Sequence, residues 1–397
     1  MKKLGFVMLF FLSMMLLAGC QEVESSFVVE VRDIQGEIVF SEELIYPEDT
    51  DLSLFEIIDE SVELDYDVTQ WGPYIKGIEG FYPMDYGVTF NYYLGLYVND
   101  EESMIGIADV DYEEDMIISF RESSMLSALD VAIDLWINSF VSDMLETYIG
   151  SAGISQHVVA AMKQLELYGY YDVKWTDFSF PDVLVDTVSN AFKSALRNKV
   201  LGQSTETIES ALADMNPTNP YDAVSMINAI DVLFGQNEQL KRDELITYLV
   251  NNNPDYMDAD FAAMALTAVS HVGSDEDMTT YIDDMVAYIA DAQVKEGISS
   301  WGNANASSTA SAILGLIAVG QNPRGESFTV EDIDLVEALM TFAKETGFKY
   351  LMTDVDADLA FSTPQAFAAL VSYKIYRDFH TSWETQSFNL WNLNLNE

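Results

Sequence analysis

The stretch DADFAAMALTAV, residues 258–269, is apolar on nearly every side of a helix and is rich in alanine. Two later stretches, Ala310 to Val319 and Ala366 to Ile375, have the same character. A helix that is hydrophobic all round is buried on all sides. The sequence therefore predicts a set of inner helices that are shielded from solvent.

Amphipathic helices alternate with these apolar ones. A helix with a single apolar stripe keeps its other face in solvent. Strict alternation of the two kinds predicts inner helices ringed by outer ones, an α/α toroid of helical hairpins over residues 124–397. The two clearest stripes are Met278, Tyr281, Met285, Ile289 and Ala292, and then Ile333, Val336, Met340 and Ala343. The polar starts of the inner helices recur at Asp222, Asp260, Ser308 and Ser362.

The chain from residue 27 to residue 121 is typical of β-structure instead. Strands are expected at 27–34 and 37–44 with Gly36 in the turn between them, and a short helix is expected after Asp51. Residues 88–98 alternate strictly, which favours one long strand, and Asn99-Asp100 then turns the chain. Further strands are expected around Ile105 and Ile107 and at 116–120. The predicted fold class is α+β, a β-rich domain with one short helix followed by the toroid.

The first twenty residues, MKKLGFVMLFFLSMMLLAGC, are predicted to be a leader and no part of the fold. Two lysines precede an apolar segment that is too short to span a membrane comfortably. The ending LAGC resembles the lipobox of bacterial lipoproteins, in which the cysteine is acylated. We therefore expect lipidation at Cys20, a tether at 21–26 and a location on the extracellular face of the bacterial cell membrane. Cys20 is the only cysteine, so no disulfide and no cysteine-ligated metal are expected.

The charge balance excludes one class of partner. The chain has 66 Asp and Glu against 18 Lys and Arg, a net charge of −48. Phosphate backbones are bound by clustered Lys and Arg, so no nucleic-acid partner is expected. Such acidity keeps a protein soluble and monomeric without identifying a ligand.

The aspartates of DVDADLAFSTPQ, residues 354–365, could be an acid catalyst, a metal site or the approach to a helix. A calcium loop counted from Asp354 needs Gly and Glu where the chain has Leu359 and Gln365. The sequence favours a helix start, with Ser362 as the capping residue and the aspartates solvating the loop. The three histidines are scattered, and each is interpreted as a surface or packing residue. No metal site is expected.

Several of these stretches resemble known families. DADFAAMALTAV, WGNANASSTASAILGLIAVGQNP and STPQAFAALVSY resemble repeats of the terpenoid-cyclase and prenyltransferase-like toroids, and most of all the toroid of the transcobalamin and intrinsic-factor family. GPYIKGIEGF and NYYLGLYVNDEESMIGIADVDYEEDMIISF resemble the small β domain of the same cobalamin carriers. The domain order is reversed here, and the segment 251–257 lacks the carriers' cobalt-binding histidine.

The resemblance implies a small-molecule ligand, with a corrinoid (cobalamin) as one candidate, held between or within the two domains. The residues it implicates are Asp222, Asp260, Asn303, Ser308, Thr309 and Gln365 in the toroid, and Trp71 and Tyr93 in the β domain. Asp260, Thr309 and Gln365 are expected to ring one mouth of the toroid. The alternative is that such residues only cap their helices.

Three functional classes stay open at this point. The first is a lipid-anchored carrier that binds a small ligand and passes it to a membrane transporter. The second is a toroid enzyme, a glycosidase or cyclase, which would place two carboxylates inside the cavity. The third is a surface interaction module without a small ligand.

Overall fold

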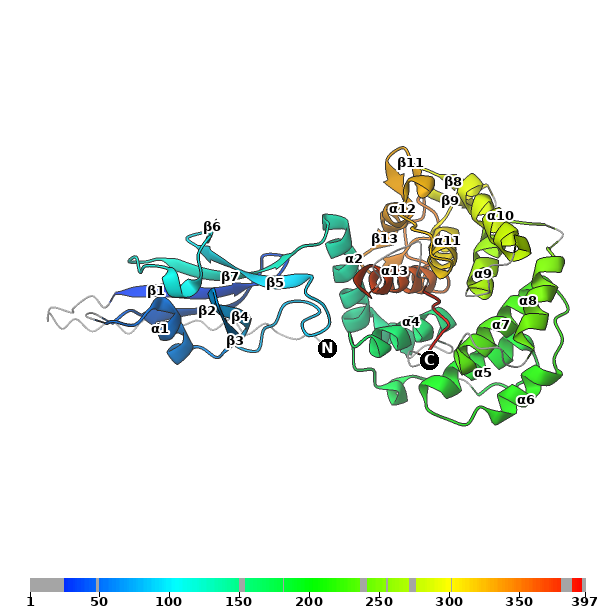
Figure 1. Cartoon of the computed structure of the whole chain (residues 1–397), viewed down its shortest axis with the longest axis horizontal. Coiled ribbons are helices and arrows are strands. Elements are labelled where there is room, and N and C mark those ends of the chain that lie inside the picture. The colour runs from blue at the N-terminus through cyan, green and yellow to red at the C-terminus, as the bar shows by residue number, and fades with distance from the viewer. Residues whose placement is uncertain are drawn as a thin grey trace. The chain divides into compact units, whose positions relative to one another are not determined.

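The computed structural model describes residues 25–47, 50–149, 154–180, 182–235, 241–254, 256–270, 276–300, 302–379 and 388–394. Cys20 and the tether expected at 21–26 therefore lie outside the described residues, except for 25 and 26. The chain divides into two compact units, one of residues up to 86 together with 90–125, and one of 87–89 together with 126 onward. The predicted α+β fold class, with a β-rich region followed by helices, is confirmed (Figure 1).

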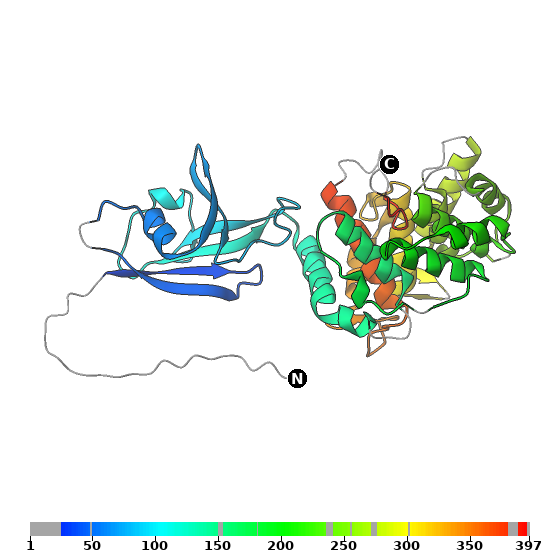
Figure 2. The same cartoon turned by 90° about the horizontal axis from the view of Figure 1, so that it is seen from below.

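The first unit is built on a five-stranded sheet with the strand order β2-β1-β7-β5-β6. β1 pairs in parallel with β7, and the other neighbours are antiparallel. A separate hairpin joins β3 and β4, and Figure 2 shows α1 on one face of the sheet. The bounds are β1 Ser26–Arg32, β2 Ile38–Ile45, α1 Leu54–Ser61, β3 Leu64–Thr69, β4 Gly72–Ile78, β5 Tyr92–Val98, β6 Glu101–Glu102 and β7 Ile117–Ser124.

Local chemistry sets the ends of these elements. The turn after β1 contains Gly36 at a φ of +87°, a conformation that glycine adopts without steric cost. Asn99 and Asp100 both have positive φ, as a two-residue hairpin turn of the right twist requires. Helix α1 begins after Ser53 because the Ser53 and Glu56 side chains and backbone groups form a reciprocal capping box.

Three expectations for this unit are wrong. The short helix starts after Ser53, where the capping box lies, and not after Asp51. The long alternating strand begins only at Tyr92, and Phe90 is 88% exposed, because alternation alone does not supply a pairing partner. Ile107 is buried in a 3-10 turn, Ile107–Asp109, instead of a strand.

The second unit is a ring of six helices. Each inner helix packs against the next one along the chain, and α13 closes the ring by packing against α4 (Figure 1). Five of them are largely buried, as their apolar residues predict, whereas the more polar α5 buries only one face. The inner helices are α4 Gln156–Leu167, α5 Val188–Val200, α7 Pro220–Phe234, α9 Ala259–Val269, α11 Ala306–Ala318 and α13 Ser362–Phe379.

Outer helices cover this ring. α6 packs on α5, α8 on α7, α10 on α9 and α12 on α11, while α2 packs on α13. The link from α4 to α5 has a 3-10 turn, Trp175–Asp177, in its described part. The outer helices are α2 Ala128–Ser139, α6 Glu206–Asp214, α8 Arg242–Asn251, α10 Glu276–Ala292 and α12 Leu335–Thr341, and α2 continues through a π-helical turn, Phe140–Met144, into α3 Leu145–Ile149.

Short β-hairpins join some outer helices to inner ones, and two of them share one device. The Thr309 hydroxyl accepts a hydrogen bond from Ile298 N–H (2.9 Å), and the Thr363 hydroxyl accepts one from Phe348 N–H (2.8 Å). Each hairpin has a positive-φ glycine whose added Cβ would lie within 2.5 Å of the threonine hydroxyl. The hairpin strands of the ring are β8 Gln293–Val294, β9 Gly297–Ser300, β10 Asn303–Ala304, β11 Thr329–Val330, β12 Ile333–Asp334, β13 Ala343–Lys344 and β14 Gly347–Phe348.

The C-terminal segment, residues 388–394, closes the end of the ring at which the inner helices finish. The Asn389 amide donates to the Asp231 carboxylate (3.3 Å), to Thr267 C=O (3.1 Å) and to the Ser270 hydroxyl (2.8 Å). The apolar side chains Phe388, Leu390, Trp391 and Leu393 are all buried. Further bonds join this segment to Gln164 of α4, Lys199 of α5 and Ile317 of α11. We call residues 388–394 the plug.

The plug is held by a buried charge. Asp231 is fully buried and pairs with Arg242 at 2.8 Å. Burial raises the pKa of Asp231 to about 6, against the opposing attraction of Arg242 and the hydrogen bonds from Arg242 and Asn389. A buried carboxylate of this kind depends on every donor around it.

Replacing Asn389 by Ala should destabilise the protein by about 2–4 kcal/mol, because it removes four buried hydrogen bonds, one of them to a charged group. Urea unfolding measures the change. Asn251→Ala is the control, since the Asn251 amide bonds only its own helix at an exposed position. If Asn389→Ala costs no more than this control, the plug does not hold the end of the ring.

Candidate ligand-binding site

Two adjoining cavities lie in the ring. The smaller is lined by the starts of α9, α11 and α13, and the larger extends from the starts of α4 and α13 to the second half of α5, close to the plug. The larger has a volume of about 760 Å³ and the smaller about 480 Å³. Phe361 and Gln365 line both of them, so the cavities meet at the start of α13. Every residue that lines them belongs to the helical unit.

The larger cavity has apolar walls and a few polar groups. Its lining comes from α3, the start of α4, the segment before α5, α5 itself and the start of α13. Among the residues that the structure describes, no aspartate or glutamate lines it. The apolar residues are Ile154, Val159, Phe180, Val183, Leu196, Leu359, Ala360, Phe361 and Pro364, and the polar ones include Tyr148, Gln156, His157, Lys193, Arg197 and Gln365.

His157 connects this cavity to the plug. Its ring meets the Trp391 ring edge-on, with the ring centroids 5.3 Å apart. Burial lowers the pKa of His157 to about 4, so the imidazole is neutral at physiological pH. It therefore offers the cavity hydrogen-bonding groups but no charge.

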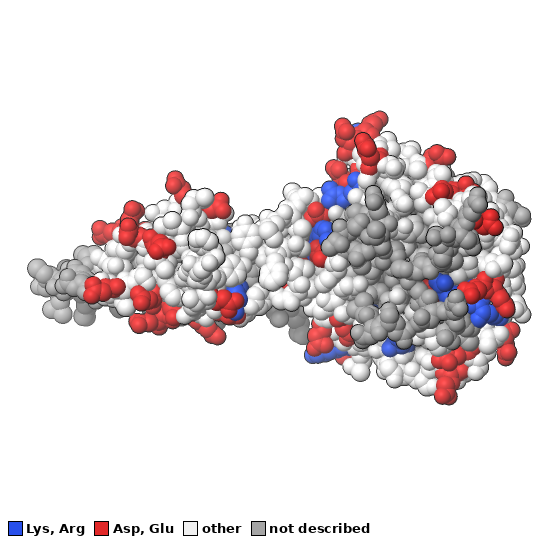
Figure 3. Space-filling view, viewed as in Figure 1, with Lys and Arg blue, Asp and Glu red and all other residues white. Residues whose placement is uncertain are grey.

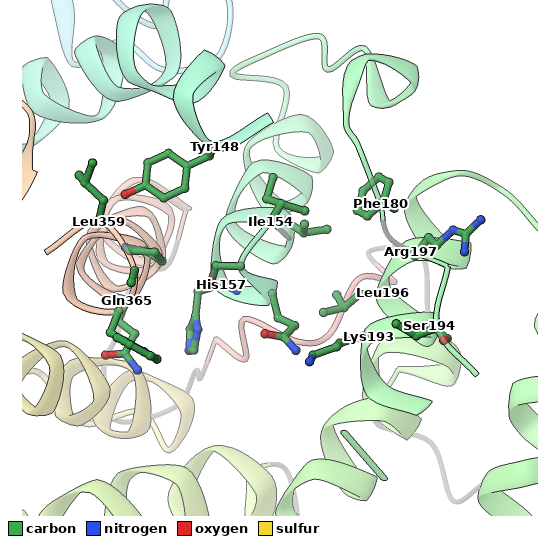
Figure 4. A pocket seen from close by; sticks show the side chains of 17 residues that line it. Tyr148, Ile154, His157, Phe180, Lys193, Ser194, Leu196, Arg197, Leu359 and Gln365 are labelled. Carbon is green, nitrogen blue, oxygen red and sulfur yellow. Dashed lines mark hydrogen bonds between the residues drawn. The ribbon is translucent and has the colours of Figure 1, made fainter. Parts of the chain in front are cut away.

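Lys193 and Arg197 lie one turn apart on α5 and bring two positive charges to the cavity lining. Arg197 pairs with the exposed Asp182 at 2.6 Å through one terminal nitrogen. Figure 4 shows Lys193, His157 and Gln365 pointing into the same space from three different helices.

The smaller cavity is lined by the starts of three neighbouring inner helices. Asp260 and Met264 come from α9, Ser307 and Ser311 from α11, and Gln365 from α13. Each pair on α9 and α11 is separated by one helical turn, so the cavity extends a turn into the ring. Tyr350, Asp358 and Phe361 of the segment before α13 complete it.

Asp260 is the ionisable group that burial in this cavity affects most clearly. Burial raises the pKa of its carboxyl, while hydrogen bonds from Ser308 and Ser300 act against this rise. The Ser300 hydroxyl donates to Asp260 at 3.0 Å. Asp260 can thus accept from its neighbours and still face the cavity.

Gln365 occupies the boundary between the cavities. Its side-chain carbonyl oxygen is buried and accepts no hydrogen bond from any of the residues that the structure describes. A buried acceptor without a donor is costly, roughly 1–3 kcal/mol. A ligand that donates a hydrogen bond here would offset that cost.

The structure brings Asp260 and Gln365 to one cavity. Ser308 does not line this cavity but forms a hydrogen bond with Asp260. Asp260 does not cap its helix. The N-cap of α9 is Asp258, whose carboxylate accepts from Phe261 N–H at 2.8 Å. The interpretation of Asp260 as an ordinary cap is therefore wrong.

Thr309 does not line the mouth as expected. Its side chain is fully buried, and its hydroxyl accepts from Ile298 N–H and donates to Asn305 C=O (2.8 Å). The first bond fastens a hairpin to α11 and the second lies within the start of α11, so the buried hydroxyl serves the fold and does not face a ligand. The N-cap of α11 is Asn305, three residues ahead of Ser308.

The remaining residues implicated by the sequence lie away from both cavities. Asp222 binds Thr218 and Asn219 at the start of α7, where it orders the turn that caps the helix. Asn303 is exposed in the short strand β10. Trp71, 81% exposed, and the half-buried Tyr93 belong to the β-rich unit.

The aspartates before α13 have a more specific role than solvating a loop. The Asp358 carboxylate accepts from the N–H groups of Ala360 (3.1 Å), Phe361 (3.2 Å) and Ser362 (3.0 Å). It also accepts from the Ser362 hydroxyl. Asp358, and not Ser362, therefore supplies the capping acceptor at the start of α13.

The larger cavity was not predicted from the sequence. Its residues come from α4 and α5, where the apolar periodicity is weaker than in the later repeats. Lys193 and Arg197, spaced four apart on one helix of a strongly acidic chain, were the available signal. His157 was interpreted as a surface or packing residue, yet it lines the cavity as well as contacting Trp391.

Known proteins do not identify this chain. The chain matches no protein-family model, and comparison with curated proteins gives no significant match. Among the described residues, no group of three or more His, Cys, Asp or Glu is arranged to hold a metal ion. Within the same part of the chain, no helix has the length and apolar character needed to cross a membrane.

The raised pKa of Asp260 makes the stability of the ligand-free protein depend on pH. A carboxyl whose pKa is raised by folding stabilises the fold below the unfolded pKa of about 3.9, and this contribution is lost as the pH rises through the folded value. In Asp260→Asn the side chain cannot ionise, so the stability of the variant should not decrease for this reason as the pH rises. Thermal melts from pH 4 to pH 8 should show the melting temperature of the variant increasing relative to that of the wild type as the pH rises. A constant difference across this range would contradict the assignment.

Proposed function

We propose that this protein binds a small molecule in the two adjoining cavities of its helical ring. The observation that carries the proposal is the asymmetry of the ring. The plug fills the end at which the inner helices finish, whereas helix starts line two open cavities, the larger with mostly apolar walls and the smaller with several polar groups. Small-molecule sites are typically concave, 300–1,000 Å³ in volume and lined in this way.

The polar groups of the smaller cavity suit a neutral ligand that has amide groups. Gln365 has an unused acceptor, and Asp260 accepts hydrogen bonds from serines on neighbouring elements. An amide N–H can satisfy such acceptors without bringing a charge into a partly dry cavity. A corrinoid with its amide side chains is the candidate that the sequence resemblance adds, and cyanocobalamin and cobinamide are the first compounds to titrate.

We propose further that the protein is a monomer anchored by lipid at Cys20 on the extracellular face of a bacterial membrane. In that position it would capture the ligand and pass it to a membrane transporter. The support is the leader sequence ending LAGC and the acidic, soluble character of the rest of the chain. Acidic side chains spread over both units and basic ones are few in the view of Figure 3.

Gln365→Ala should weaken binding of cyanocobalamin or cobinamide several-fold while leaving the melting temperature nearly unchanged. A lost hydrogen bond to a neutral amide is worth about 0.5–1.5 kcal/mol. Isothermal titration gives the affinity, and one thermal melt per variant gives the stability.

Thr309→Val is the matched control for this experiment. It removes a hydroxyl that fastens a hairpin and faces neither cavity, so it should lower stability and leave the affinity unchanged. If both compounds fail to bind the wild type at micromolar concentrations, a corrinoid is not the ligand. If Thr309→Val and Gln365→Ala weaken binding equally, the cavity is not where the ligand binds.

An enzyme, a glycosidase or cyclase, is the second candidate because the carboxyl groups of Asp260 and Asp358 line the same cavity. Acid–base catalysis needs both groups free to exchange protons. Both oxygens of Asp358 accept hydrogen bonds from the start of α13, which keeps this carboxylate occupied. Binding is therefore favoured over catalysis. Asp260→Asn would abolish turnover by an enzyme and change the affinity of a carrier only several-fold.

Cys20→Ala should release the protein from membranes, or leave its leader uncleaved, because the chain has no other thiol to acylate. Membrane fractionation of cells grown with labelled palmitate measures both outcomes. Cys20→Ser is a second variant with a closely similar side chain. If either variant is cleaved correctly and still partitions with membranes, the lipid anchor is not at Cys20.

A further inference from the structure

We infer that the larger cavity selects ligands that carry an anionic group, a carboxylate or a phosphate, on an apolar body. This inference rests on the proposed function, since it concerns the chemistry of one of the two cavities. It goes beyond the neutral, amide-bearing ligand that the smaller cavity favours.

The first support is the distribution of charge. The chain has 66 acidic and 18 basic residues, so most surfaces of this protein repel an anion. The described lining of the larger cavity reverses that ratio, because it includes Lys193 and Arg197 and no carboxylate. A cavity with low-dielectric walls concentrates the field of its lining charges.

The second support is the bonding of the two cations. One terminal nitrogen of Arg197 forms an ion pair with Asp182, whose side chain is 91% exposed. Its Nε is buried and has no acceptor among the residues that the structure describes. No hydrogen bond or ion pair of the Lys193 amino group is found within the same residues, and this side chain is solvent-accessible at the cavity. Lys193 can therefore receive an anion without first breaking a salt bridge, whereas Arg197 keeps its pair with Asp182 and adds positive charge nearby.

The third support is the apolar surface that faces these cations. Ile154, Val159, Phe180, Leu196 and Phe361 line the cavity from α4, α5 and the segments beside them (Figure 4). Because His157 is neutral, it adds no competing charge. An amphipathic anion would place its body against these walls and its charged group against α5.

Two fluorescent probes with almost the same aromatic body test the inference. 8-Anilinonaphthalene-1-sulfonate is an anion, and N-phenyl-1-naphthylamine is its neutral counterpart. In 0.15 M salt the wild type should bind the anion at least about tenfold more tightly than the neutral probe, since hydrogen bonds to charged groups are the stronger ones. Lys193→Gln and Arg197→Gln should each reduce that preference several-fold and leave the neutral probe unchanged.

Lys295→Gln is the matched control because it removes the same charge from a half-exposed lysine outside the cavity. Displacement of the anionic probe by dodecanoate or by dodecyl phosphate tells which anionic group is preferred, with dodecanol as the neutral reference. Equal displacement by dodecanol overturns the inference, as does an equal effect of Lys193→Gln and Lys295→Gln.

The outcomes separate this inference from the proposed function. If the neutral probe binds as tightly as the anion, the anionic preference fails and the ligand-binding function stands. If neither probe binds but cyanocobalamin does, the inference fails alone. If neither the probes nor the corrinoids bind, both fail.

Discussion

The ring depends on how closely its inner helices approach one another. At Gly315 of α11, an added Cβ would lie 2.6 Å from the carbonyl oxygen of Ala263 on α9, so the two backbones are in direct contact. Alanines on both helices and Gly315 on α11 make this approach possible, which explains why these inner helices are rich in alanine. Helices set this close can converge on a common axis and close a ring of six. Each outer helix then only has to cover one apolar face, which is why the amphipathic stripes are narrow.

Buried charges fix the ring where apolar packing cannot specify a unique partner. α13 meets α2 through Lys374 and Arg377, both of which pair with the fully buried Asp134 at 3.1 and 2.9 Å. Arg242 and Asp231 anchor the plug in the same manner. In the described part of the helical unit, Arg242, Lys374 and Arg377 take part in such buried pairs, and Arg324 joins a partly buried one. Breaking one partner of a buried pair is far more costly than breaking a surface pair. The acidic surface therefore coexists with a small number of cations whose positions define the fold.

The sequence was informative where the structure is local and periodic. The apolar runs at 261–269, 310–319 and 366–375 lie within α9, α11 and α13, and Tyr281, Met285 and Ile289 form the buried stripe of α10. It was uninformative where a position depends on distant partners. Asp260 and Thr309 each lie near the start of an inner helix. Asp260 faces a cavity, whereas Thr309 binds a hairpin that packs on its helix, and the sequence around the two residues does not reveal this difference. The plug was not predicted because its sequence, FNLWNLN, has no period and its bonds reach residues more than a hundred positions away.

The two ends of the ring differ because the backbone N–H groups at the helix starts and the C=O groups at the helix ends find their hydrogen-bond partners in different ways. Each inner helix begins with its own capping acceptor, namely Ser155, Thr187, Asn219, Asp258, Asn305 and Asp358. These local caps satisfy the first N–H groups, so side chains such as Asp260 and Gln365, just beyond them, are left to face a cavity. The carbonyl groups at the other end receive donors from the plug instead: Asn389 binds Thr267 C=O, Asn394 binds Asp231 C=O and Val232 C=O, and Phe388 N–H binds Ile317 C=O. Because the plug must lie against these carbonyl groups to donate to them, it fills that end of the ring. The helix starts need no such segment, and for that reason the smaller cavity can lie where α9, α11 and α13 begin.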